Sequence, residues 1–160
     1  TPLYSSAASD VYKRQTLIKQ KRYSIVLKLI DYNIRTSQHM TEIKLKRVYE
    51  DPENDDGFRV LVDRLWPRGM RKDHLKYDIW AKEVTPSPNL RKWFHEDIKN
   101  RWNDFVAMYQ KELDGADAVK DFIKKIESYN IVTLLYASRE PVYNHASILK
   151  VYLEKVLGKK

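Results

Sequence analysis

Cysteine is absent from the 160 residues, and glycine occurs only four times. Without cysteine the chain has no disulfide framework, no thiolate nucleophile and no cysteine-ligated metal site, and it suits a reducing cytoplasm. The four glycines never form GxGxxG or P-loop spacing, which argues against an ordinary dinucleotide fold and a Walker ATPase. We therefore expect a cytoplasmic protein without a tightly bound cofactor.

Long apolar runs, metal-binding histidine pairs and glycine-flanked serines are also missing. The apolar segment 25–30 is interrupted by Lys28 and is far too short to cross a bilayer, so no membrane partner is expected. His95 would need a second histidine four residues later to bind zinc, but that position is Lys99. Ser138 lacks the flanking glycines of a nucleophile elbow, which disfavours a covalent serine mechanism. No metal site is predicted.

Charge is plentiful but unevenly placed. Residues 1–41 hold seven Lys/Arg and two acidic residues, whereas residues 42–160 hold 23 and 20. Such a mild excess permits a phosphate-bearing partner but is weaker than the basic footprint of a dedicated DNA-binding protein. Because the first methionine is Met40 and residues 5–15 resemble a translated adapter, we expect residues 1–39 to be a non-native or disordered leader. A genuine basic extension, helical or disordered, is the alternative.

Two almost uninterrupted apolar segments, 58–64 and 131–137, indicate central strands of a sheet. Continuous apolar and β-branched residues are typical of strands that are covered on both faces. Segment 43–49 alternates apolar and basic residues, which predicts a half-buried strand whose basic side chains suit an edge of the sheet. Segment 72–85 is mixed, and Trp80 should anchor a loop or a short strand there.

Amphipathic segments separate and follow the central strands. Ser87 before Pro88 predicts a helix start. Gly115 should end a second helix and Asn130 a third, and a last helix is expected over about 142–157. The first three helices are predicted to bury Leu90, Phe94 and Ile98; Trp102, Phe105, Val106, Tyr109 and Leu113; and Val119, Phe122, Ile123, Ile126 and Tyr129. This order predicts a single α/β domain over residues 40–157, with a tail at 158–160. Its fold should be a three-layer open, largely parallel sheet flanked by helices.

Charged and polar side chains follow both predicted central strands. Because ligands of open parallel sheets bind in a crevice beyond the carboxyl ends of the strands, Asp63 and Ser138 should meet at one rim. Arg64 and Arg68 could grip a carboxylate or phosphate bidentately, while Asp63 orients them or acts as a base. An internal ion pair that pins the turn at Trp66 is an equally open alternative.

Two further pairs of residues are candidates for the same crevice. His145 and Asn144 lie near the amino end of the last helix, where free amides and an imidazole proton can contact an anion. A structural histidine bonded to a neighbouring loop is the commoner alternative. Arg91 and His95 are four residues apart on one helical face and either line the crevice or face solvent. Trp66 could stack on a ligand or anchor the core.

Several blocks of sequence occur together in this chain: 59–69 (RVLVDRLWPRG), 80–87 (WAKEVTPS), 90–95 (LRKWFH), 133–136 (TLLY) and 144–146 (NHA). The combination resembles the YeaO-like branch of the domain-of-unknown-function family DUF 488, from about residue 43 to 157. The resemblance implies a small bacterial or archaeal cytosolic α/β protein without an established activity. Other branches carry Cys-His-Arg at positions 144–146. Only His145 matches, so a thiol mechanism or an arginine clamp there does not transfer.

These observations predict a strand-end crevice that binds a small anionic or phosphorylated ligand. If the protein is an enzyme, which the sequence leaves open, Asp63 and His145 would serve acid–base hydrolysis or group transfer. Ligand binding is assigned to Arg64, Trp66, Arg68, Arg91, His95, Ser138 and Asn144. One rival is a non-catalytic nucleic-acid module that uses Lys44, Lys46, Arg47, Arg71 and Lys72. Another rival is a protein-interaction adaptor with an exposed aromatic patch. The oligomeric state is not predicted.

Overall fold

The structure, a computed structural model, describes residues 5–37 and 40–158, with side chains of the first helix described over 13–29. The chain divides into two units, residues 1–38 and 39–160. In the first unit, α1 (Ser5–Ser37) is a single helix whose described side chains are exposed. A domain start at Met40 stays a prediction. Within the described residues, no helix combines the length and the apolar character needed to cross a membrane.

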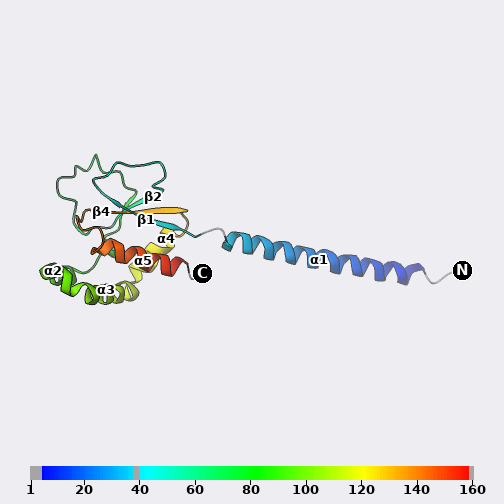
Figure 1. Ribbon diagram of the computed structural model, residues 1–160. Helices are drawn as coiled ribbons and strands as arrows, with labels where there is room; N and C mark the ends of the chain where they lie inside the picture. Colours follow the sequence, from blue (N-terminus) through cyan, green and yellow to red (C-terminus); the bar gives the residue numbers. More distant parts are fainter. Residues whose placement is uncertain (1–4, 38–39, 159–160) are drawn as a thin grey trace. The chain divides into compact units, whose positions relative to one another are not determined.

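The second unit is built on a four-stranded parallel sheet in the order β1-β4-β2-β3 (Figure 1). Its strands are β1 (Glu42–Arg47), β2 (Phe58–Leu61), β3 (Ile79–Trp80) and β4 (Ile131–Tyr136). β4 pairs with β1 along its whole length and with β2 on its other side. The two apolar segments are therefore central, and β1 is an edge strand, as predicted. The parallel arrangement directs all carboxyl ends to one edge of the sheet.

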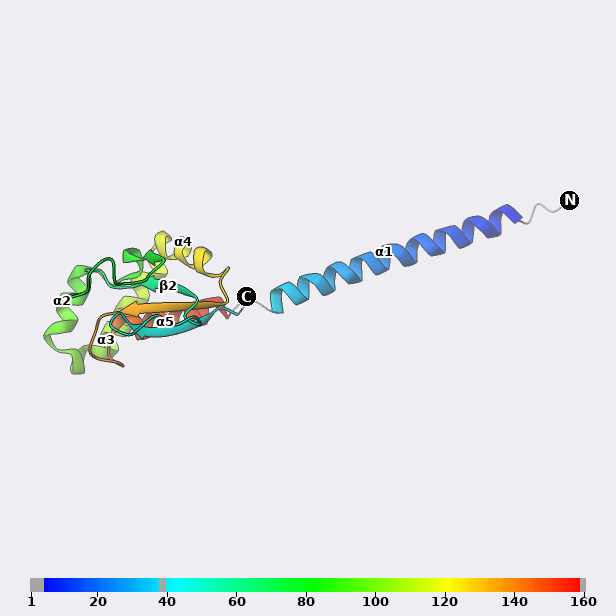
Figure 2. The same cartoon turned by 90° about the horizontal axis from the view of Figure 1, so that it is seen from above.

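One face of the sheet is covered by helices (Figures 1 and 2). These are α2 (Pro88–Glu96), α3 (Ile98–Gly115), α4 (Asp117–Ile126) and α5 (His145–Leu157), and a short 3-10 helix, η1 (Lys82–Val84), precedes them. Val60, Val132 and Leu134 point from the central strands into one core cluster with these helices. The alternation of strand side chains thus assigns all four helices to the same face.

The opposite face is covered by connecting chain. Leu61 and Leu135, the alternate residues of the central strands, pack with Val48 and Leu75 in a second, smaller cluster. Trp66 and Trp80 pack against this cluster. The sheet therefore lies between a helical layer and a layer of loops, and the predicted α/β class with a parallel sheet is confirmed.

A buried ionic centre attaches the acidic turn 51–57 to the loop-covered face. The carboxylate of Asp56 lies 2.9 Å from Nζ of Lys46 and also contacts the guanidinium of Arg59. The three side chains are only 5%, 10% and 9% exposed, respectively. The hydroxyl of Thr133, on β4, donates to the backbone oxygen of Asp56 at 2.6 Å. Since buried charges are stable only when paired, the turn is held on the sheet by its acid.

The helix predicted to start at Ser87 is shorter than expected. The start itself is confirmed, because the Ser87 hydroxyl accepts from the backbone N–H of Leu90 at 3.2 Å. Ile98, however, belongs to α3. Asp97 separates the two helices, and its carboxylate accepts from the backbone N–H of Asn100 at 3.3 Å as the cap of α3. The cap formed by Asp97 thus separates the amphipathic pattern of α2 from that of α3.

Candidate ligand-binding site

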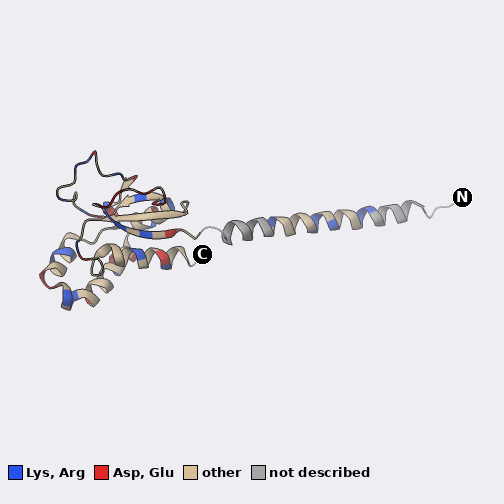
Figure 3. Ribbon diagram, turned by 45° about the horizontal axis from the view of Figure 1, so that its top comes forward, with Lys and Arg blue, Asp and Glu red and all other residues tan. Residues whose placement is uncertain are grey.

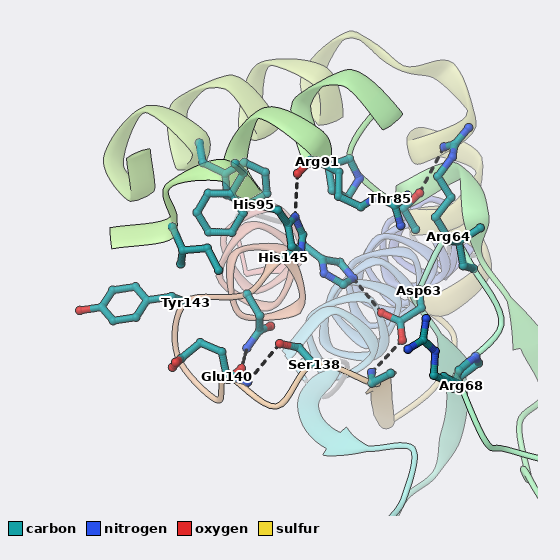
Figure 4. A pocket seen from close by; sticks show the side chains of 18 of the residues that line it. Asp63, Arg64, Arg68, Thr85, Arg91, His95, Ser138, Glu140, Tyr143 and His145 are labelled. Atoms are coloured by element: carbon teal, nitrogen blue, oxygen red, sulfur yellow. Dashed lines mark hydrogen bonds and ion pairs between the residues drawn. The ribbon is translucent and has the colours of Figure 1, made fainter. Parts of the chain in front are cut away.

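A pocket of about 280 Å³ opens at the carboxyl ends of β2 and β4 (Figure 4). Every residue predicted for the site lines it: Asp63, Arg64, Trp66, Arg68, Arg91, His95, Ser138, Asn144 and His145. Further lining residues are Leu65, Pro67, Thr85, Pro86, Phe94, Ile98, Phe105, Ala137, Glu140 and Tyr143. The structure thus brings three separate segments of the chain together, as expected for a parallel sheet.

Asp63 ties the two central strands together where their backbone ladder ends. β2 was predicted to reach residue 64, but its last ladder contact is from the N–H of Val62 to the carbonyl of Leu135, at 3.0 Å. One residue later, the Asp63 carboxylate accepts from the N–H of Ala137 at 2.7 Å, in place of a backbone carbonyl. The indole N–H of Trp80 donates to the Asp63 carbonyl at 2.6 Å. These contacts hold the carboxylate at the floor of the pocket.

His145 is paired with Asp63. Its Nε2 lies 2.8 Å from the carbonyl oxygen of Val62 and 3.4 Å from Oδ1 of Asp63. Both neighbours are acceptors, so Nε2 carries a hydrogen and Nδ1 is the nitrogen that gains or loses a proton. Figure 4 shows the ring between Asp63 and His95. Within the described part of the chain, Nδ1 takes part in no hydrogen bond, which leaves it available to a ligand.

Asn144 fixes the position of His145. Its Oδ1 accepts from the N–H of Ser147 at 3.0 Å, and its Nδ2 donates to the carbonyl of Glu140 at 2.8 Å. This cap starts α5 at His145, three residues later than the predicted helix start near position 142. Both ends of the buried amide are engaged inside the protein, so Asn144 acts on the site through the helix it caps. Its direct contact with a ligand stays a prediction.

Burial moves the pKa values of the pair toward each other. Burial raises the pKa of Asp63 above its ordinary value, although His145, the Ala137 N–H and Arg91 all oppose the shift. Burial lowers the pKa of His145, and the attraction of Asp63 opposes this. The charges of His95 and Arg91 lower the pKa of His145 further. The two α2 residues therefore act electrostatically on the pair, and they line the pocket rather than only facing solvent.

We expect the imidazole of His145 to titrate below its ordinary pKa of 6.5. Asp63→Asn removes an attraction to the imidazolium and should lower the pKa further. A depressed pKa means that the stability contributed by His145 is present above pH 6.5 and is lost as the pH falls through the pKa of the folded state. Imidazole 13C NMR titrations of both proteins measure this, with His74, outside the pocket, as the internal control. A pKa above 6.5, or one that rises in Asp63→Asn, would contradict the assigned pairing.

The arginines of the pocket have few partners. The guanidinium of Arg64 lies 3.4 Å from the hydroxyl of Thr85, a weak contact. Over residues 40–158, neither Arg68 nor Arg91 forms a salt bridge. The ion pair considered as an alternative, between Asp63 and a neighbouring arginine, is not formed among these residues either, because the carboxylate contacts an imidazole instead.

The loop that carries Arg68 is held by aromatic side chains. The indole N–H of Trp66 donates to the carbonyl of Met70 at 2.6 Å, and the hydroxyl of Tyr49 donates to the carbonyl of Arg68 at 3.0 Å. Trp66 also packs edge-on against Trp80, with ring centroids 5.4 Å apart. Trp66 is therefore a core anchor that also lines the pocket. The backbone of Arg68 is fixed, while its guanidinium has no acidic partner within the described part of the domain.

Ser138 and His95 form hydrogen bonds within their own segments of the chain. The Ser138 hydroxyl accepts from the N–H of Glu140 at 3.1 Å, which orients it within its own loop. His95 Nδ1 lies 2.7 Å from the carbonyl of Arg91, one helical turn earlier. Both side chains line the pocket, and their ligand contacts stay predictions.

Glu140 and Tyr143 are pocket residues that the sequence reasoning missed. Both lie on the loop after β4, between Ser138 and Asn144. Their position after a central strand was the same signal that identified Ser138, and it applied to the whole loop. Thr85 likewise stood in a conspicuous sequence block without being assigned to the site.

Lysines proposed for nucleic-acid contact are engaged in ion pairs. Lys44 Nζ lies 2.9 Å from the carboxylate of Asp55, and Lys46 Nζ lies 2.8 Å from that of Glu53 in addition to its bond with Asp56. Figure 3 shows basic and acidic residues interspersed over the second unit. The charge of the edge strand is thus largely neutralised by the acidic turn.

The geometry defines an α/β protein with a ligand-sized pocket at the carboxyl edge of a parallel sheet. Residues 42–160 match the family model described as the inactive DUF488-N3 subclade, so the chain belongs to the DUF488 family. It is 40% identical to the uncharacterised protein YeaO of Escherichia coli K12 over 114 residues, which cover 71% of this chain and 98% of YeaO. It is 42% identical to the uncharacterised protein Rv3073c of Mycobacterium tuberculosis H37Rv over 109 residues, covering 68% and 91% of the two chains. The predicted YeaO-like resemblance is confirmed. No solved structure matches significantly.

Proposed function

We propose that the strand-end pocket binds a small anionic ligand through the guanidiniums of Arg64, Arg68 and Arg91. The carrying observation is that all three line one pocket without a carboxylate partner over residues 40–158. The buried cations on the loop-covered face of the sheet do have a carboxylate partner, because Lys46 and Arg59 both pair with Asp56. Guanidinium groups bind carboxylate and phosphate bidentately, which suits a ligand that bears either group.

In this proposal the Asp63–His145 pair supplies the polar floor of the pocket. Nδ1 of His145 is the atom that would contact the ligand, as an acceptor when neutral and as a donor when protonated. A bound anion favours the protonated ring, so ligand binding should raise the pKa of His145. A cytoplasmic location, which the lack of cysteine favours, belongs to the same proposal.

Binding without turnover is the form of the proposal that we favour. The matching family model is described as inactive. The chain has no cysteine, and the pocket's one serine is held by its own loop through the N–H of Glu140. An anion-binding protein requires only the arginines and the polar floor, whereas covalent catalysis requires an activated nucleophile.

Acid–base catalysis is the second candidate, favoured by the Asp63–His145 contact at 3.4 Å. A carboxylate that holds an imidazole in one tautomer is an arrangement used in proton transfer. Hydrolysis of p-nitrophenyl phosphate and p-nitrophenyl acetate, followed from pH 5 to 9, tests this candidate. Turnover that is lost in His145→Gln while ligand binding is retained would support acid–base catalysis. If no turnover above background is detected, ligand binding is the only function that remains.

Thermal shift and calorimetry against inorganic phosphate, sugar phosphates, nucleotides and carboxylates test the binding proposal. Arg64→Ala combined with Arg68→Ala should weaken ligand binding by at least about 100-fold, because each of the two charged hydrogen-bonding groups contributes about 1.5 kcal/mol or more. Arg71→Ala with Lys72→Ala removes the same charge outside the pocket and should leave affinity within about twofold, which is the scale of screened surface charges. Absence of binding by the wild type, or equal loss in both double variants, would reject the pocket as the binding site.

A further inference from the structure

We infer that the ligand carries an aromatic ring next to its anionic group, so that its class is an aryl or heteroaryl phosphate or carboxylate. This inference rests on the proposed anion site and adds the part of the ligand that the arginines do not bind. It follows from the two chemically different ends of the pocket. The charged end comprises Asp63, Arg64 and Arg68, and we call the other end the apolar wall: Pro86, Phe94, Ile98, Phe105 and Tyr143.

The apolar wall is a fixed surface. Phe94 and Phe105 stack with ring centroids 3.9 Å apart and planes inclined by 9°. Phe105 stacks in turn on Tyr109, whose hydroxyl donates to the carbonyl of Val84 in the core. Because Phe94 and Phe105 are only 3% and 1% exposed, this row of rings is a firm backing tied into the core, and Ile98 and Tyr143 are the members of the wall that an incoming group can reach.

Tyr143 is the most exposed member of the wall. It lies on the loop after β4, its side chain is 44% exposed, and its ring meets Trp102 edge-on with centroids 5.1 Å apart. Figure 4 shows Tyr143 on the far side of His145 from Arg64 and Arg68. A ligand whose anion reaches the arginines would therefore extend past the imidazole toward an aromatic surface. Aromatic rings prefer offset or edge-on contact with other aromatic rings, which favours a flat ring at this end.

The volume of the pocket limits the size of the ligand. About 280 Å³ lies just below the range of about 300–1,000 Å³ that ligand pockets occupy, so the ligand must be small. One ring and one anionic group fit that space, whereas a dinucleotide is too large. The net charge of the lining agrees with a single anionic group, because the pocket is lined by three arginines and two carboxylates, those of Asp63 and Glu140.

Calorimetric titration with matched phosphates tests the inference. We expect phenyl phosphate to bind at least tenfold more tightly than methyl phosphate, since burying part of a ring contributes a factor of about ten. Cyclohexyl phosphate, of similar size but not flat, should bind less tightly than phenyl phosphate. Tyr143→Ala should remove most of the preference for phenyl phosphate and leave the affinity for methyl phosphate unchanged. Val142→Ala, at an exposed neighbouring position that does not line the pocket, is the control and should change neither.

The outcomes separate this inference from the proposed function. Equal binding of phenyl and methyl phosphate, or tighter binding of cyclohexyl phosphate, would contradict the inference that the ligand carries an aromatic ring. Either result would still be consistent with the proposed anion site. Absence of binding by all of these phosphates and by benzoate overturns both. Tighter binding of AMP than of phenyl phosphate would contradict a ring next to the anionic group, because a ribose separates the base of AMP from its phosphate, whereas tighter binding of benzoate supports an aryl carboxylate. Loss of methyl phosphate binding in Tyr143→Ala would contradict the division of the pocket into two ends.

Discussion

Replacing Asp56 by alanine is expected to lower the free energy of unfolding by about 3–5 kcal/mol, because removing one partner of a buried ion pair leaves an uncompensated buried charge. Here two cations lose their common partner, since Asp56 contacts both Lys46 and Arg59. Neither cation can reach water easily, as their side chains are 10% and 9% exposed. Chemical denaturation followed by circular dichroism, at pH 7 in 50 mM and 500 mM salt, measures the loss.

Asp55→Ala is the matched control. Asp55 pairs with Lys44 at 2.9 Å, but its side chain is 70% exposed, and exposed pairs contribute about 0–1 kcal/mol. Its effect should also shrink at high salt, whereas that of Asp56 should not, because buried pairs are poorly screened. Equal losses in the two variants, or a salt-dependent loss in Asp56→Ala, would show that the centre is hydrated and that the turn is not held by its charge.

The contrast between the two faces of the sheet underlies the functional proposal. On the loop-covered face every buried cation described has a carboxylate partner, and Asp56 serves two of them. At the strand ends, the carboxylate of Asp63 contacts His145, and no salt bridge joins it to the guanidiniums of the pocket within the described residues. The same residue types are thus used for stability in one place and are available for binding in the other.

The sheet was predictable because its strands obey simple patterns. The continuous apolar character of 58–64 and 131–137 identified the central strands, since only strands covered on both faces can be apolar throughout. The rule for strand ends then brought Asp63 and His145 to one pocket, although they are far apart in the sequence. The helix start at Ser87 was equally local, because one hydroxyl and the following proline define it.

Features that depend on tertiary contacts were not predictable. The rival nucleic-acid hypothesis used the lysines of β1 because nothing local shows that the acidic turn folds back over them. Asp97 divides one apolar periodicity into two helices, which spacing alone does not reveal. β2 ends early because the carboxylate of Asp63 replaces a backbone acceptor, an exchange visible only once β4 is in place. The pairing of Asp63 with His145 rather than with an arginine is of the same kind.

Gly57→Ala should destabilise the protein by about 2–5 kcal/mol, the sum of two costs. Gly57 has φ +62°, and a Cβ there would lie 2.3 Å from the backbone oxygen of Ile131. The backbone conformation alone costs about 1–2 kcal/mol for a residue with a side chain, and the clash with β4 adds about 1–3 kcal/mol. The rigid strand cannot move aside, so the turn carrying Asp56 must shift. Urea denaturation of Gly57→Ala against the wild type measures the loss.

Gly69→Ala separates the two costs. Gly69 has φ +78°, but a Cβ there would meet nothing within 4 Å, so only the conformational cost of about 1–2 kcal/mol is expected. Gly69 follows Arg68 in the loop that lines the pocket. Its substitution should therefore reduce the free energy of binding phenyl phosphate by more than it reduces the free energy of unfolding. Gly57→Ala should lower the free energy of unfolding but leave the affinity of the folded protein for phenyl phosphate unchanged, since the acidic turn lies outside the pocket. Equal stability losses in the two variants would show that β4 yields to the new methyl group.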